Sequence, residues 1–487
     1  MKKLTLLSCL LFIYLGASAQ VFKQLNKQSV KKADIGYGAD AAMQGSICVV
    51  GADGDNSRKG SLFVYYQNKN GNDSWGLQKN IKAEDLEAGS RCGGSVSLSG
   101  DYIIAGATGV NKGAGAAYIF NKNEGGNDNW GQVKKLIPSS TNTKWYYGSS
   151  VSILNNTAAV GSKSQDGGVG AVYIYEKDKG GDNNWGESQL IKAPQQKTEG
   201  SFGEKVLLYG NRLFVGASSD GKNATGLVYV YIKFAGSWSL QTTITPSESF
   251  DNALFGWSIA VKDDYLAVGA IHHNGNGAVF VYKKENGKYK EIKKIDDPVS
   301  QNYEERFGYS LNFYKDYLLI GSPSKEDHGD KAGAVLVYSI NNDKVTAAGE
   351  VPFPKNDVLF EGFNFGKSIA TADQYLVVPV PNYYLNYSLV YFFKQDNTGI
   401  ASITSKDNSV KIYPNPVSSL GSINIDSKIK DGSFSIIDLN GKNVSKEIRL
   451  DDNGQGRNIQ LPNLPKGTYF IQIKSNNESI SETLIIK

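Results

Sequence analysis

Two glycines separated by thirteen residues recur along most of this chain, and this spacing constrains its fold more than any other feature. The first glycine follows an aromatic residue or a substitute for one, and the second usually precedes alanine or serine. Six pairs of glycines lie thirteen positions apart, and in a seventh copy proline takes the second place: Gly38 and Gly51, Gly93 and Gly106, Gly148 and Gly161, Gly203 and Gly216, Gly256 and Gly269, Gly308 and Gly321, and Gly366 and Pro379. Successive copies start 55, 55, 55, 53, 52 and 58 residues apart. A fixed period of this length indicates a repeat architecture.

The second copy shows how one repeat is built. Residues 95–99 alternate polar and apolar side chains, as a half-buried strand does, and a Gly-Asp turn follows them. Residues 102–105 and 116–120 are apolar runs typical of buried strands, and residues 132–136 form a fourth strand after a polar hairpin. This pattern predicts a four-stranded antiparallel meander. We therefore expect an all-β chain, with a seven-bladed β-propeller built from such sheets.

The aromatic residue before the first glycine is expected to pack between neighbouring sheets. Only the second copy lacks a ring, because Cys92 takes its place. Pro379, at the second glycine position of the last copy, fixes φ near −65°. If the seventh repeat keeps the fold, glycine in the other six copies reflects a close backbone approach rather than a positive φ. Divergence of the last repeat is the competing explanation.

The last repeat lacks a fourth strand after Phe393. Residues 20–25 resemble the fourth strand at 132–136. We therefore expect residues 20–30 to supply the outer strand of the last blade and to close the ring, which removes an exposed edge.

Residues 1–19 have the pattern of a secretory signal peptide, with Lys2 and Lys3, an apolar run and a small-residue cleavage site at 17–19. No later segment approaches the roughly 20 apolar residues that span a membrane. The net charge is only +4 and no basic stripe occurs, so we expect no nucleic-acid partner. Export would permit a disulfide between Cys48 and Cys92. Two small buried thiols are the alternative.

The clearest copies are Phe255-Gly256 with Gly269-Ala270 and Phe307-Gly308 with Gly321-Ser322-Pro323. They resemble FG-GAP repeats, known from integrin α-subunits and bacterial surface proteins, and the resemblance covers residues 20–393. It implies a seven-bladed propeller used for binding. Calcium-binding copies of the family carry an aspartate-rich loop before the second glycine, whereas this chain has tight turns such as Lys262-Asp263-Asp264-Tyr265. These turns offer too few oxygen ligands, so we expect neither a metal nor another cofactor. We read the acidic stretch 52–56 as a solvated turn.

The composition changes near residue 394, and residues 394–408 are predicted to be a polar linker. Short alternating strands separated by turn signals then predict a small β-sandwich. The Tyr413-Pro414-Asn415-Pro416 segment and residues 464–469 resemble the type A C-terminal sorting domain of the type IX secretion system of Bacteroidetes, over residues 409–487. That resemblance implies the type IX secretion machinery as a partner. It also implies a secreted or outer-membrane-surface location, with the domain removed and the protein released or attached.

Catalytic motifs are not evident in the sequence. The three histidines, His272, His273 and His328, belong to two adjacent repeats, and there is neither a nucleophile elbow nor an HExxH motif. Carboxylate pairs such as Asp263-Asp264 and Glu304-Glu305 lie on predicted turns and are read as solvated. We therefore expect no catalytic residue and no metal site.

The residue after the first glycine varies between repeats and is therefore predicted to be exposed. It is Ala39, Gly94, Ser149, Glu204, Trp257, Tyr309 and Lys367 in turn. Trp257 and Tyr309 would lie on adjacent blades. With Tyr383, Tyr384 and Tyr387 of the last repeat they are the candidate ligand-binding residues, able to stack on sugars or to anchor a protein. The alternative is that these rings pack on neighbouring loops. The tryptophans that recur in the hairpins, at 75, 130, 185 and 238, are predicted to be structural.

These features favour a secreted or surface-displayed binding or adhesion protein that engages a glycan or protein ligand through one propeller face. A polysaccharide-acting enzyme with axial carboxylates and a passive structural scaffold are the alternatives. A deep axial pocket with two opposed carboxyls would favour the enzyme. A shallow aromatic face would favour binding.

Overall fold

The computed structural model describes residues 21–31, 36–139, 144–297, 305–354, 362–381, 387–395, 411–426, 433–438, 443–446, 448–449, 455–474 and 479–487. The chain divides into two compact units. One comprises Gln20–Gln395, and the other contains the residues from Asp396 to Lys487. The predicted signal peptide, most of the predicted linker, and Tyr383 and Tyr384 lie outside the described residues.

The first unit is made of four-stranded antiparallel sheets in which consecutive strands pair. The first sheet contains β2 (Tyr37–Gln44), β3 (Ile47–Ala52), β4 (Ser61–Gln67) and β5 (Trp75–Ile81). The next five sheets repeat this order: β6 (Cys92–Ser99), β7 (Tyr102–Ala107), β8 (Ala116–Asn121) and β9 (Gly131–Leu136); β10 (Ser150–Leu154), β11 (Thr157–Ser162), β12 (Ala171–Glu176) and β13 (Gly186–Lys192); β14 (Phe202–Tyr209), β15 (Arg212–Ala217), β16 (Leu227–Phe234) and β17 (Ser237–Ile244); β18 (Phe255–Lys262), β19 (Tyr265–Ala270), β20 (Ala278–Glu285) and β21 (Lys288–Asp296); β22 (Ser310–Tyr314), β23 (Tyr317–Ser322), β24 (Ala334–Asn341) and β25 (Lys344–Glu350). Short helical turns follow the second strand of the first five sheets: α1 (Asp55–Arg58), α2 (Val110–Gly113), α3 (Gln165–Gly168), η1 (Lys222–Ala224) and η2 (His273–Gly275).

The seventh sheet is built from both ends of this unit. Its strands are β26 (Ala370–Ala372), β27 (Tyr375–Val380), β28 (Tyr387–Gln395) and the N-terminal β1 (Phe22–Lys31). β1 pairs antiparallel with β28, with Phe22 opposite Gln395 and Lys31 opposite Tyr387. The strand beside β28 at the edge of this sheet therefore comes from the N-terminal part of the unit.

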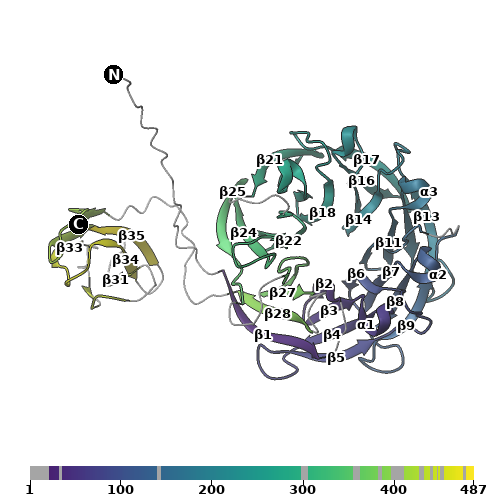
Figure 1. Cartoon of the computed structure of the whole chain (residues 1–487), viewed down its shortest axis with the longest axis horizontal. Coiled ribbons are helices and arrows are strands. Elements are labelled where there is room, and N and C mark those ends of the chain that lie inside the picture. The colour runs from purple at the N-terminus through teal and green to yellow at the C-terminus, as the bar shows by residue number, and fades with distance from the viewer. Residues whose placement is uncertain are drawn as a thin grey trace, which may run out of the picture. The chain divides into compact units, whose positions relative to one another are not determined.

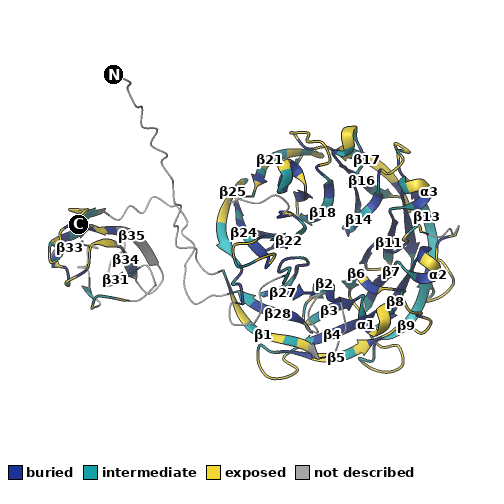
Figure 2. Ribbon diagram, in the orientation of Figure 1, coloured by how far each residue is buried: buried dark blue, intermediate teal, exposed yellow. Residues whose placement is uncertain are grey.

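The inner strands of the seven sheets form a circuit (Figure 1). β2 contacts β6, and the contacts continue through β10, β14, β18, β22 and β26, which contacts β2 again. In each sheet the middle strands are mostly buried, and exposed residues gather on the hairpins and outer strands (Figure 2).

The two glycines of each repeat have different structural roles. Gly203 has φ +90°, and the amide of the next residue, Glu204, donates to the Ser201 carbonyl at 3.0 Å, which closes a tight turn. Gly161, a second glycine, has no positive φ, but a Cβ there would lie 2.1 Å from the carbonyl oxygen of Gly203. The other five second glycines approach the next sheet equally closely, between 1.9 and 2.2 Å. The interpretation that Pro379 suggests, close approach rather than a left-handed conformation, is confirmed.

The aromatic residues before the first glycines pack between sheets, as predicted, and none is more than 1% exposed. The hairpin tryptophans also pack on the preceding sheet. Trp75 stacks on Phe392 of the seventh sheet with ring centroids 5.2 Å apart, and Trp130 Nε1 donates to the Tyr66 hydroxyl at 3.0 Å. These rings connect neighbouring sheets.

Cys48 and Cys92 are free, buried thiols in this structure, so the disulfide alternative is not realised here. The two thiols are apart because side chains alternate between the two faces of a strand, and Cys48 points away from the second sheet. Cys48 faces the core between the first and seventh sheets, with Tyr37 and Phe392, whereas Cys92 belongs to the core between the first and second sheets, with Val64 and Tyr118. The two thiols lie on opposite sides of the first sheet.

The C-terminal unit contains two sheets over one core. One sheet has β29 (Lys411–Tyr413), β30 (Ser422–Asp426) and β33 (Gln455–Gln460), and the other has β32 (Ile448–Arg449), β31 (Ser433–Ile437), β34 (Gly467–Lys474) and β35 (Ser479–Ile486). The segment that contains Tyr413-Pro414-Asn415-Pro416 covers the edge of β35. Asn415 Oδ1 accepts from the Ile485 amide, and the Val417 amide donates to the Ile485 carbonyl, both at 2.9 Å. This arrangement covers backbone groups that an edge strand would otherwise expose.

Candidate functional site

A pocket of about 460 Å³ lies where the inner strands of all seven sheets converge. The residue after the first glycine of every repeat lines it: Ala39, Gly94, Ser149, Glu204, Trp257, Tyr309 and Lys367. The tight turn at each first glycine directs this residue to the pocket. The residue after the first glycine, whose type changes from repeat to repeat, therefore sets the chemistry of the pocket. We call this pocket the axial pocket.

Trp257 and Tyr309 meet in the axial pocket. They come from adjacent sheets, their ring centroids lie 5.5 Å apart at 53°, and both side chains remain partly exposed. Burial raises the pKa of the Tyr309 phenol. Of the other candidate residues, Tyr387 begins β28 and pairs with Lys31, while Tyr383 and Tyr384 lie outside the described residues.

Two of the carboxylates that line the pocket are engaged by the protein itself. Asp40 accepts hydrogen bonds from the amides of Ala41 and Val96 and from the Ser368 hydroxyl, each at 2.9 Å. Glu204 forms an ion pair of 2.7 Å with Lys163. Both groups therefore hold neighbouring sheets together at the pocket wall.

Asp53 differs from these two carboxylates. Its Oδ1 atom is buried and has no hydrogen-bond partner among the described residues. Two positions without side chains border it, because a Cβ on Gly36 would lie 2.3 Å from Oδ1 and a Cβ on Gly94 would lie 3.8 Å from the Asp53 Cβ. Burial raises the pKa of Asp53, and the charges of Lys367, Arg91 and Arg58 oppose that rise. The reading of this stretch as a solvated turn is wrong, because Asp53 lines the pocket and Asp55 is buried, accepting from Ser61 at 2.6 Å.

Serines on the inner strands complete the polar wall. Ser95 Oγ accepts from the Val151 amide at 3.1 Å, and Ser150 Oγ accepts from the Val206 amide at 3.0 Å. Each bond links one inner strand to the next. Ser258 acts in the opposite sense and donates to the Gly308 carbonyl at 2.5 Å. The sequence did not reveal this set, because a serine at alternate strand positions has the same pattern as a solvent-facing residue.

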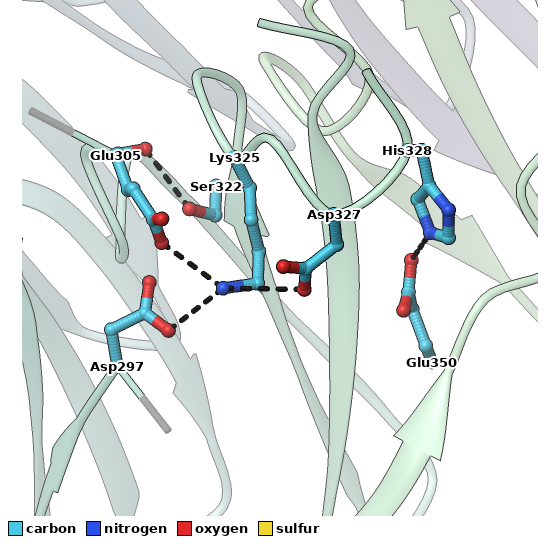
Figure 3. Close-up of polar contacts among 7 residues, drawn as sticks. All are labelled: Asp297, Glu305, Ser322, Lys325, Asp327, His328 and Glu350. Atoms are coloured by element: carbon cyan, nitrogen blue, oxygen red, sulfur yellow. Dashed lines mark hydrogen bonds and ion pairs between the residues drawn. The ribbon is translucent and has the colours of Figure 1, made fainter. Parts of the chain in front are cut away.

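A buried ionic cluster supports the segment that leads to Tyr309 (Figure 3). Lys325 Nζ lies 3.0 Å from both Asp297 Oδ1 and Glu305 Oε2 and 3.4 Å from Asp327 Oδ2. The side chains of Lys325, Asp297 and Glu305 are 2%, 1% and 6% exposed. Burial, with a hydrogen bond to Asp297, raises the pKa of Glu305 to about 7. Reading Glu305 as a solvated turn residue is therefore wrong, and Glu304 lies outside the described residues.

The histidines occupy separate environments. His273 is buried between the rings of Phe250 and Phe280. His328 pairs with Glu350 at 2.8 Å (Figure 3). The His328 ring also stacks on Phe353. Within the described part of the chain, no group of three or more histidine, cysteine, aspartate or glutamate side chains is arranged to hold a metal ion.

Repeated four-stranded sheets followed by a separate β unit define the class of repeat proteins, and comparison with family models identifies both parts. The FG-GAP repeat model matches residues 75–120, 130–175 and 238–282, and the secretion system C-terminal sorting domain model matches residues 411–487. The chain therefore carries FG-GAP repeats and ends in a type IX secretion sorting domain, as its sequence motifs predict. Each FG-GAP match runs from the outer strand of one sheet to the third strand of the next, so the conserved unit spans a sheet boundary.

The sorting domain indicates export, with the protein secreted or displayed at the cell surface. Comparison with curated proteins finds none that matches the chain. None of the helices in the described residues is long and apolar enough to cross a membrane.

Proposed function

We propose that residues 20–395 form a closed seven-bladed propeller whose axial pocket binds an extracellular glycan or protein ligand. The protein would then act as a secreted or surface-displayed binding or adhesion protein. Its signal peptide at residues 1–19 would lead it to the periplasm, and its sorting domain would take it across the outer membrane. The circuit of inner strands and the pairing of β1 with β28 support the closed ring.

The observation that carries the proposal is the partly exposed pair of Trp257 and Tyr309 inside a pocket that is otherwise largely polar. The aromatic residues before the first glycines are at most 1% exposed, as Phe255 and Phe307 illustrate in the same two repeats. Trp257 and Tyr309 follow those rings by two residues, yet keep surface open to the pocket. Exposed aromatic surface of this kind gains free energy when a ligand covers it.

The pocket carboxylates favour binding over hydrolysis. Glycoside hydrolysis needs two carboxyl groups free to face one bond, one as an acid and one as a base or nucleophile. Asp40 and Glu204 are already committed to hydrogen bonds and an ion pair with the protein. Asp53 is then the pocket carboxylate with an unbonded oxygen, and one such group does not make a pair.

The test is an array of glycans and extracellular proteins probed with the mature, secreted protein. Three forms are compared: wild type, Trp257→Ala, and Phe234→Ala, which removes an aromatic ring that is 80% exposed on a hairpin. We expect a ligand that wild type and Phe234→Ala bind equally and that Trp257→Ala binds at least about tenfold more weakly, the equivalent of roughly 1.4 kcal/mol. Polysaccharide hydrolysis by the wild type without stable binding would support the enzyme instead.

A further inference from the structure

The axial pocket has two chemically different walls. Trp257 and Tyr309 form an aromatic wall on the fifth and sixth sheets, and Ser95 and Ser150 belong to a hydroxyl wall on the second and third sheets. Around the circuit, the fourth sheet lies between the two walls on one side, and the seventh and first sheets lie between them on the other. The two walls therefore lie across the pocket from each other.

The hydroxyl wall retains the capacity to donate hydrogen bonds. Ser95 and Ser150 accept backbone amides from the next inner strand, and a hydroxyl that accepts in this way keeps its own hydrogen for another partner. Asp53, in the loop after β3, also lines the pocket beside Gly94, with its unbonded Oδ1 atom buried against Gly36. The pocket thus combines an apolar face, hydroxyl donors and a carboxylate.

This combination disfavours the common side chains of a protein ligand. An aromatic or aliphatic side chain would cover Trp257 but would leave the serine hydroxyls without a hydrogen-bond partner. A lysine or arginine side chain would pair with Asp53, but Lys367, Arg91 and Arg58 already act on that carboxylate and would repel it. An anionic group would meet Lys205 and Lys367 but also Asp40, Asp53 and Glu204, so the lining residues carry no net positive charge to attract it.

A neutral ring with an apolar face and a rim of hydroxyl groups avoids all of these costs. The C–H face of a pyranose can lie on an aromatic side chain while its hydroxyls both donate and accept hydrogen bonds. The volume of about 460 Å³ falls within the roughly 300–1,000 Å³ of small-molecule sites. We infer that the axial pocket binds an uncharged pyranose unit of a carbohydrate, a conclusion that rests on the proposed role of the pocket as the ligand site.

The experiment measures the binding of uncharged methyl pyranosides, and of short neutral oligosaccharides that contain them, to the mature full chain by isothermal titration calorimetry. Trp257→Ala removes the stacking surface, and Asp53→Asn keeps the size of the side chain while it removes the charge. Asp263→Asn is the matched control, because the Asp263 side chain is 73% exposed on the turn between β18 and β19. Melting temperatures of all variants are recorded to confirm that they fold.

We expect at least one of these saccharides to bind the wild type and Asp263→Asn alike. Trp257→Ala should weaken that binding at least about tenfold, equal to roughly 1.4 kcal/mol, and folded Asp53→Asn should weaken it about fivefold or more. Binding of a peptide or protein that depends on Trp257, with no saccharide bound, would overturn this inference and leave the proposed function standing. Saccharide binding unchanged in both pocket variants would overturn both.

Discussion

The Asp40 carboxylate accepts a hydrogen bond of 2.9 Å from the hydroxyl of Ser368, a residue 328 positions away in the sequence. The Ala41 amide donates to the same Ser368 hydroxyl at 3.1 Å. These contacts join the inner strand of the first sheet to the segment that enters β26 of the last. On the outer side of the seventh sheet, β1 provides a second connection between the ends of the repeat region. Early and late parts of the sequence should therefore stabilise one another.

Removing the contact of Phe22 should destabilise the whole first unit. Phe22 is 0% exposed and packs on Tyr314 of the sixth sheet with ring centroids 5.0 Å apart. Phe22→Ala should lower the free energy of unfolding by about 3–5 kcal/mol, and deletion of residues 20–30 should lower it further. Urea denaturation followed by circular dichroism measures this, with the exposed Lys23→Ala as the control. A midpoint that does not move after the deletion would show that β1 does not close the ring.

The second glycine of a repeat should not tolerate alanine. In Gly161→Ala the new methyl group would lie 2.1 Å from the Gly203 carbonyl oxygen, so either β11 or β14 must move. We expect a loss of about 1–3 kcal/mol in the free energy of unfolding. Pro379→Ala is the matched control, because it changes the equivalent position of the last repeat without adding a Cβ. Equal midpoints of denaturation for Gly161→Ala and wild type would refute the close approach.

Lys325 should be required for the stability of the sixth sheet. Lys325→Met would leave Asp297 and Glu305 buried without their shared cation, a change that typically costs about 3–5 kcal/mol. The control is Lys294→Met, which breaks a 2.6 Å pair with a Glu248 side chain that is 62% exposed and should cost less than about 1 kcal/mol. Differential scanning calorimetry compares the two variants. Similar melting temperatures for both would mean that the buried cluster contributes no more than a surface pair.

Glu305 should make stability depend on pH near neutrality. Its pKa in the folded protein is raised from 4.5 to about 7, mainly by burial. Between these values the folded state holds a proton that the unfolded state has released, so this contribution to stability is complete below pH 4.5 and is lost as the pH rises to about 7. Glu305→Gln should flatten that decline. Urea midpoints measured from pH 4.5 to 8 test this, and identical slopes in wild type and variant would contradict it.

The repeat pattern predicted the four-stranded sheets and the buried rings, because these features recur in step with the glycines. Trp257 and Tyr309 were identifiable because they break the pattern at a position that faces the pocket. Asp53 and Glu305 were misread because the cations that act on them, Lys367 and Lys325, come from other sheets or loops, and an acidic residue near a turn has the same local pattern as a solvated one.

One signal in the sequence could have revealed the buried polar positions. The fourth residue after the second glycine is Asp55, Val110, Gln165, Asp220, His273 and Lys325 in the first six repeats. All six side chains are at most 5% exposed, and Val110 is the member whose type indicates burial. Three of its polar counterparts pair within nine residues: Asp55 with Ser61, Gln165 with Tyr173, and Asp220 with the Tyr229 hydroxyl at 2.6 Å. The place four residues after the second glycine is therefore the feature that these buried side chains share.

Blocking the axial pocket tests the central claim most directly. Ser149 lines the pocket, and the native Cys48 and Cys92 are 0% exposed, so a cysteine introduced at 149 should be the reactive thiol of the mature protein. Unmodified Ser149→Cys should bind the ligand found on the array as wild type does. Coupling to a bulky maleimide should abolish that binding, while the same reagent on Asp263→Cys, at the exposed turn between β18 and β19, should leave it unchanged. Full ligand binding by the maleimide-modified Ser149→Cys protein would contradict the account.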